Sequence, residues 1–81
     1  MSDTQKSQEI LEIHRRYGVP LSMTVPFLLK LNGWAVGETA EAAGYTRAHL
    51  HQVLRRGLEP PSGLRNIVAK RLGVDPWGYD K

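Results

Sequence analysis

Four polar side chains that can make paired hydrogen bonds lie close together in the segment GETAEAAGYTRAHLHQVLRRG, residues 37–57. They are Arg47, His51, Gln52 and Arg55. Arginine carries its donors in a planar fork, glutamine combines donors with an acceptor, and a histidine ring can serve in either role. At about 100° per residue these positions share one side of a helix. The segment therefore predicts a polar face that could recognise a partner.

Basic residues gather around this segment. From Arg47 to Arg71 there are six basic residues and one acid, Glu59, whereas the remaining positions hold five basic and seven acidic residues. A local excess of positive charge of this kind predicts an electropositive surface and a polyanionic partner. The alternative interpretation is a solvated surface without a partner, and the charge count alone does not decide between the two.

Composition narrows the class of protein. The chain has 81 residues, of which 41% are hydrophobic, and it contains no cysteine. We expect one domain, residues 1–81, that buries roughly 60% of its unfolded surface without disulfides or thiolate zinc sites. No apolar run approaches the roughly 18 residues that a membrane helix needs, and the polar start MSDTQKSQEI is unlike a signal peptide. A cytoplasmic protein without membrane contact is expected.

The sequence contains few of the residue patterns typical of catalytic or metal-binding sites. It lacks a cysteine nucleophile, a phosphate-binding glycine loop and an evident serine, histidine and acid arrangement, so we do not expect an enzyme. His49 and His51 point about 200° apart on a helix, which argues against a shared metal. The aromatic residues could line a ligand pocket, but in so small a chain we assign them to the core or to an interface. No cofactor or small-molecule substrate is expected.

Two helices are predicted before residue 34. The first covers residues 7–17 and ends at Gly18 and Pro20, with His14 near its apolar face. In the second, Thr24 is placed to cap the first turn and Pro26 to lie in it, and Asn32 with Gly33 ends the helix. The side chains expected to face the core from the second helix are those of Phe27, Leu28 and Leu31.

Two further helices meet at a tight turn. Residues 35–43 form a short helix, and Gly44 ends it because glycine accepts the left-handed conformation that lets the chain reverse. Thr46 is placed to cap the next helix, whose inward residues are Leu50, Val53 and Leu54. Small residues, Ala40 and Ala43, would allow the two helices to cross closely. This pattern predicts a helix-turn-helix, with residues 36–43 supporting and residues 46–56 presenting the polar face.

A last helix follows the loop GLEPPSG. It begins at Ser62 and ends at Gly73, and the tail VDPWGYDK is predicted to be too short for a helix but able to fold back onto the domain through Val74, Trp77 and Tyr79. The core positions of this last helix are Leu64, Ile67, Val68 and Leu72.

The segment AVGETAEAAGYTRAHLHQVL resembles the helix-turn-helix of the family that includes lambda-type phage repressors and Cro proteins. Ala40, Gly44, Leu50 and Val53 match the small, glycine and apolar positions of that family. The later PPSGLRNIVAKRLGVDP resembles the closing helix, and its end is similar to Ner-type phage regulators. The resemblance covers roughly residues 22–77 and implies a small all-α, lambda-repressor-like bundle, to which residues 1–20 add an N-terminal helical extension.

The resemblance implies double-stranded DNA as the partner, read in the major groove. Arginine pairs with guanine, glutamine with adenine, and an alanine methyl meets the thymine methyl. Carried onto this sequence, the base contacts fall on Thr46, Arg47, Ala48, His51, Gln52 and Arg55. By their charge, Arg56, Arg65 and Lys70 are better suited to phosphate contacts, which set affinity and register.

Three positions depart from the family pattern. Val36 stands where the family often has a glutamine that contacts phosphate. Ala35 stands where the family often has a serine or threonine that caps the helix. Thr39 stands where an aliphatic residue is common.

The function implied is a repressor-type regulator of phage or prophage origin that binds a palindromic operator as a homodimer, in the cytoplasm and at the nucleoid. The alternative is an antitoxin-like module in which the N-terminal helix holds another protein and DNA binding is secondary. Two surfaces could form the dimer, the N-terminal helix and the tail, although the same residues could instead cover the small core. The residues concerned are Ile10, Ile13, Tyr17, Trp77 and Tyr79.

Overall fold

The computed structural model describes residues 3–79, with side chains from residue 5 to residue 78, and every regular element in that range is a helix. The predicted small all-α bundle is confirmed. The elements in chain order are α1 (Asp3–Arg16), α2 (Leu21–Leu31), α3 (Val36–Ala42), α4 (Arg47–Arg56), α5 (Ser62–Leu72) and a short 3₁₀ helix, η1 (Pro76–Tyr79).

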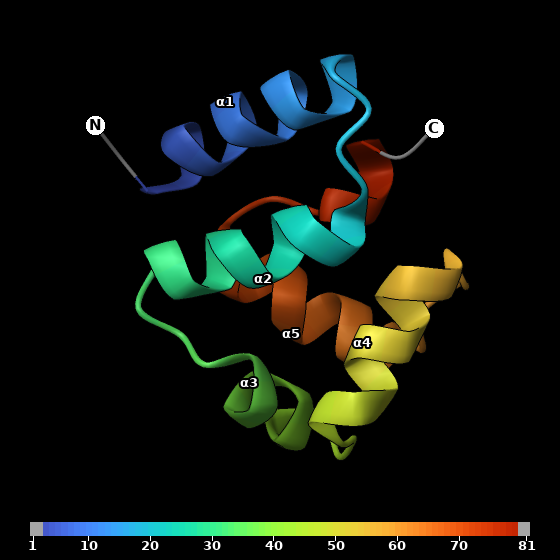
Figure 1. Cartoon of the computed structure of the whole chain (residues 1–81). Coiled ribbons are helices and arrows are strands. Elements are labelled where there is room, and N and C mark those ends of the chain that lie inside the picture. Colours follow the sequence, from blue (N-terminus) through green and yellow to red (C-terminus); the bar gives the residue numbers. More distant parts are fainter. Residues whose placement is uncertain (1–2, 80–81) are drawn as a thin grey trace.

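The helices are arranged around one core. α1 lies across α2 and η1 at one end of the molecule, and α3 and α4 form the opposite end, with α5 behind α2 (Figure 1). Every element contributes at least one buried apolar side chain. The core comprises Leu11, Val25, Leu28, Leu29, Ala40, Leu50, Val53, Leu54, Leu64, Val68, Leu72 and Trp77.

The N-terminal helix is part of this core. Leu11 is 1% exposed, and Ser7 is fully buried and accepts a hydrogen bond at 3.3 Å from the amide of Asn32 at the end of α2. Ile10 is half-buried against the core, whereas Ile13 and Tyr17 are exposed. The helix also begins earlier than the sequence indicated, at Asp3 instead of residue 7. α1 therefore seals the end of the bundle that lies away from α3 and α4.

The prediction for the start of α2 was wrong. The helix begins at Leu21 after Pro20, and Thr24 lies one turn inside it. The Thr24 hydroxyl donates to the Pro20 carbonyl at 3.3 Å and lies 2.8 Å from His14 Nδ1, so it joins α2 to α1. His14 is half-buried, as expected. Because the helix starts earlier, Pro26 falls in its interior and not in its first turn.

Two of the three expected core residues of α2 are not in the core. Phe27 is 50% exposed and Leu31 is 48% exposed, whereas Leu28 is buried as predicted. The inward positions are taken by Val25, Leu28 and Leu29, because α2 turns this side towards α5 and α4. Spacing alone could not choose between these faces, since both sides of the helix carry large apolar residues.

The tail folds back, as expected, but it forms a helical turn that the sequence analysis did not predict. Asp75 Oδ1 accepts a hydrogen bond from the Trp77 amide at 3.1 Å, which starts the turn of η1. Trp77 is 9% exposed and covers the core of its own chain, which is the alternative that the sequence left open for it. The side chain of Tyr79 lies outside the part of the chain that the structure describes.

Candidate nucleic-acid interface

The turn between α3 and α4 is fixed by backbone hydrogen bonds. Gly44 has a φ of +83° and donates to the Glu41 carbonyl at 2.9 Å, and the Tyr45 amide donates to Ala40 at 2.9 Å. The helix therefore ends and the chain reverses within residues 43–46. Ala40, fully buried at this point, provides the small side chain that the sequence predicted there.

The start of α4 is capped as predicted. The Thr46 side chain accepts a hydrogen bond from the His49 amide at 3.1 Å. Gly57, with a φ of +65°, ends the helix after ten residues. These local signals position α4 independently of any partner, because each satisfies backbone groups at a helix end.

One side of α4 is seated in the core, and the other side is bare. Leu50, Val53 and Leu54 are buried, with exposures of 0%, 3% and 5%. On the opposite side, the expected base-contacting side chains are exposed, except for His51, which is half-buried. Four of these residues and Arg56 surround a shallow open hollow, which is lined by Ala48, His51, Gln52, Arg55 and Arg56. The structure thus brings the predicted residues of α4 to one free face.

Arg47 and His51 border a second hollow, between α4 and the end of α2. Arg47 Nε donates to His51 Nε2 at 3.5 Å, which is at the long end for a hydrogen bond. The Arg47 side chain also lies beside Gly37 at the start of α3. The rest of this hollow is lined by Pro26, Lys30, Gly33, Trp34, Ala35 and Val36.

Lys30 is a candidate residue that the sequence analysis missed. Its exposed side chain extends the basic surface from α4 to α2, in the hollow that Val36 also lines. Only a three-dimensional arrangement could have shown this, because Lys30 lies 17 positions before Arg47 in the chain.

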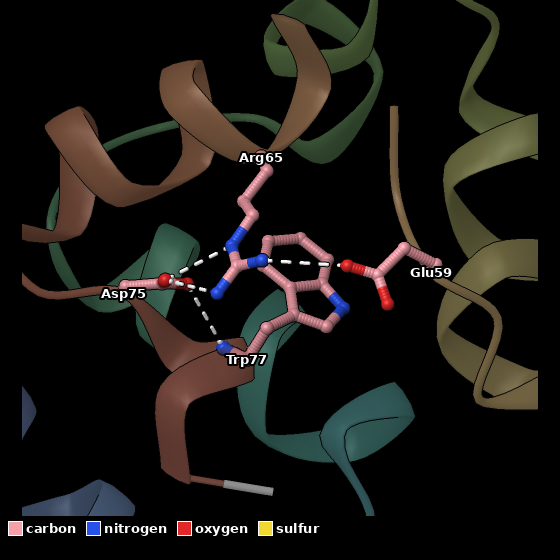
Figure 2. A network of polar contacts seen from close by, with 4 residues as sticks. All are labelled: Glu59, Arg65, Asp75 and Trp77. Carbon is pink, nitrogen blue, oxygen red and sulfur yellow. Dashed lines mark hydrogen bonds and ion pairs between the residues drawn. The ribbon is translucent and has the colours of Figure 1, made fainter. Parts of the chain in front are cut away.

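Arg65, an expected phosphate contact, is already bound within the chain. Figure 2 shows its guanidinium between Asp75 and Glu59. Nε and Nη2 donate to Asp75 Oδ2 at 2.9 and 2.6 Å, and Nη1 lies 3.5 Å from Glu59. The hydrogen bonds to Asp75 raise the pKa of Arg65. This side chain therefore ties α5 to Asp75, just before η1, and to the loop after α4, and it has fewer donors left for phosphate.

Arg71 is also held internally. It donates to both carboxylate oxygens of Glu38 and to the Thr39 hydroxyl at 2.9 Å, and its guanidinium lies 4.2 Å from the centre of the Trp34 ring. Its side chain is only 12% exposed. The Thr39 hydroxyl donates in turn to the Ala35 carbonyl at 2.8 Å, which explains how a polar residue occupies this buried position. Arg71 thus fastens α3 to α5.

These ion pairs reduce the free basic surface that the charge count suggested. Of the six basic residues between positions 47 and 71, two are paired with carboxylates. Arg47, Arg55 and Arg56 remain exposed on α4. Lys70 is exposed in the last turn of α5 and lines neither of the two hollows. Within residues 47–71, the positive charge that no carboxylate pairs with therefore lies mainly on α4.

No protein-family model matches the chain, and no characterised protein or solved structure matches it either. Within residues 3–79, no helix has the length and apolar character needed to cross a membrane.

Proposed function

We propose that this protein is a sequence-specific DNA-binding regulator of the lambda-repressor and Cro type, whose α4 enters the major groove. The observation that carries the proposal is the free polar face of α4, directly opposite three buried apolar side chains. A helix held in this way can present its side chains to base edges without losing its own packing. The uneven charge supports the same partner, since exposed arginines attract a polyanion.

Four side chains of the face are assigned to bases in this proposal. Arg47 and Arg55 offer the forked donors that suit guanine, and Gln52 offers the donor and acceptor that suit adenine. Ala48 presents a methyl group to thymine. Arg56 and the newly found Lys30 are free to bind phosphates, which set affinity and register without reading sequence.

We propose that the protein binds DNA as a two-fold dimer. A single recognition helix of ten residues contacts too few base pairs for a specific site in a genome. Helix-turn-helix proteins commonly meet this need by binding two half-sites about 34 Å apart. We therefore propose a palindromic operator, occupied by two copies in the cytoplasm, as in repressors of phage or prophage origin.

Selection from random duplexes tests this function directly. Full-length protein is incubated with a random DNA library, and bound duplexes are amplified and sequenced over several rounds. The proposal predicts recovery of an inverted repeat, with an affinity that falls steeply as salt rises. Recovery of no enriched sequence would overturn it and favour the antitoxin-like alternative, in which another protein is the main partner.

A further inference from the structure

Three large apolar side chains form an exposed row along α2. Met23 is 64% exposed, Phe27 is 50% exposed and Leu31 is 48% exposed. Their spacing of four residues places them one above the other on the helix surface. The core uses the other side of α2, and none of these three side chains belongs to the buried core of the described residues.

The row continues onto α1. The rings of His14 and Phe27 lie 6.1 Å apart across the seam between the two helices. Ile13 and Tyr17, beside His14, are 48% and 76% exposed. Around α1, His14 lies between the buried Leu11 on one side and Ile13 and Tyr17 on the other. Ile13 and Tyr17 therefore lie on the outer side of the seam. We call the exposed surface of Ile13, Tyr17, Met23, Phe27 and Leu31 the outer face.

The outer face has the character of an interface. Its five side chains are all large and apolar or aromatic, and each is at least 48% exposed. Soluble monomers rarely leave several large apolar side chains adjacent and exposed unless that surface binds something. The row on α2 is also symmetric about Phe27, because Met23 lies four residues before it and Leu31 four residues after it.

This symmetry fits a second copy of the same chain. If two α2 helices pack antiparallel about a two-fold axis at Phe27, Phe27 meets Phe27, and Met23 of each copy meets Leu31 of the other. The three side chains form one i±4 row on each copy, so the two rows can lie alongside each other when the helices are close to antiparallel. A two-fold contact requires this kind of self-complementary surface.

The available area indicates a weak dimer. With about 200 Å² for a fully exposed side chain of this size, the exposed fractions of the outer face amount to roughly 570 Å² per copy. A standard stable interface buries about 800 Å² per partner, so the contact falls in the class of transient interfaces. Two half-sites on one duplex would raise the effective concentration of the second copy and complete the dimer.

We propose that the outer face is the contact between two copies of this chain, with α2 packed antiparallel on α2. This contact would supply the surface of the dimer in the proposed function. Only its role in DNA binding rests on the proposed function. The contact itself forms without DNA.

Sedimentation without DNA tests the contact. Wild-type protein should show concentration-dependent dimerisation, and Phe27→Glu should weaken it by about 30-fold or more, because a charge at the centre of an interface has no partner there. Leu58→Glu is the matched control, since Leu58 is 48% exposed in the loop after α4. Equal dimerisation of Phe27→Glu and wild type, or a wild type that stays monomeric at millimolar concentration, would overturn the inference.

Cross-linking tests the antiparallel register and does not depend on the folding of a charged variant. The chain contains no cysteine, so single cysteines can be introduced without side reactions. Facing Cα atoms of two helices whose axes are 8–10 Å apart are about 5 Å apart, which suits a disulfide. Phe27→Cys should therefore form a covalent dimer under mild oxidation. Met23→Cys should not pair with itself, because two copies of position 23 lie about 12 Å apart in this register.

A mixture of Met23→Cys and Leu31→Cys chains should form the mixed dimer in preference to either homodimer. Leu58→Cys serves as the control for random collision. Equal cross-linking at positions 27 and 58, or faster pairing of Met23→Cys with itself, would overturn the register. A dimer with this register in a protein that selects no DNA would uphold the inference and refute the proposed function. A selected inverted repeat with no cross-link at position 27 would support the proposed function and refute the inference.

Discussion

At the scale of single residues, the two kinds of DNA contact predict different effects of substitution. Gln52 and Arg56 are both exposed on α4, but the first is proposed to read a base and the second to bind phosphate. Gln52→Ala should lower discrimination at one base pair of each half-site by about 1–3 kcal/mol. Arg56→Gln should weaken binding to all sequences and reduce the salt dependence.

The measurement is a set of affinities for the selected operator and its single-base variants at several salt concentrations. Lys6→Gln, on α1 and far from α4 in the fold, is the control and should change neither quantity. A uniform loss of affinity in Gln52→Ala, without relaxed specificity, would contradict the role given to Gln52.

The Arg71–Glu38 ion pair gives a prediction on pH. The hydrogen bond from Arg71 lowers the pKa of Glu38 below the ordinary value of 4.5. A carboxylate with a lowered folded-state pKa stabilises the fold above its unfolded-state pKa, and this contribution disappears as pH falls through the folded-state value. The melting temperature of wild type should therefore fall more steeply below about pH 4.5 than that of Glu38→Gln. The difference should be small because the pair is partly exposed.

Thermal unfolding followed by circular dichroism at a series of pH values measures this difference. Glu41→Gln is the matched control, since the exposed Glu41 carboxylate on the same helix makes no ion pair in the described structure. Parallel curves for wild type and Glu38→Gln would show that Arg71 does not stabilise the fold through Glu38.

At the scale of elements, the turn between α3 and α4 depends on the backbone of Gly44. A Cβ atom there would meet nothing within 4 Å, so the cost of Gly44→Ala comes only from its φ of +83°. That cost is about 1–2 kcal/mol. Gly63→Ala is the control, because Gly63 lies in α5 without a positive φ and with equal open space around it. It should stabilise the protein by up to about 1 kcal/mol.

Chemical denaturation of the two variants measures both free energies of unfolding. Opposite signs are the expected result. A destabilisation of similar size at both glycines would mean that the turn has no special backbone requirement.

The elements that the sequence predicted well are those whose ends carry local signals. Thr46, Gly44 and Gly57 satisfy or reverse the backbone next to them, so α3 and α4 could be placed without knowledge of the fold. The start of α2 was missed because Thr24, which looks like a cap, instead bonds to His14 ten positions earlier. Local patterns contain no information about such a contact.

The candidate site was also predictable in part from the sequence. The free face of α4 followed from its apolar positions, which the structure buries as expected. The internal pairing of Arg65 and Arg71 could not be predicted, because their partners lie 10 and 33 positions away. The exposure of Phe27 depends likewise on which neighbours α2 packs against, and both faces of that helix are apolar enough to be buried.

At the scale of the whole molecule, α1 is required for the stability of the domain. Leu11 is 1% exposed in the core, whereas Ile13, two residues on, is 48% exposed. Leu11→Ala should cost about 2–5 kcal/mol, a large part of the stability of so small a protein. Ile13→Ala should cost much less in the monomer. Denaturant titration at low protein concentration gives both values, and equal costs would mean that α1 is not packed as described.

The central claim is that the bare face of α4 is the surface that meets DNA. The most direct measurement is an NMR titration of isotope-labelled protein with the selected operator duplex. We predict that the largest shifts fall on residues 46–56 and on the start of α3, with smaller changes around Lys30. Shifts concentrated elsewhere, with the signals of α4 unmoved at saturation, would contradict the account.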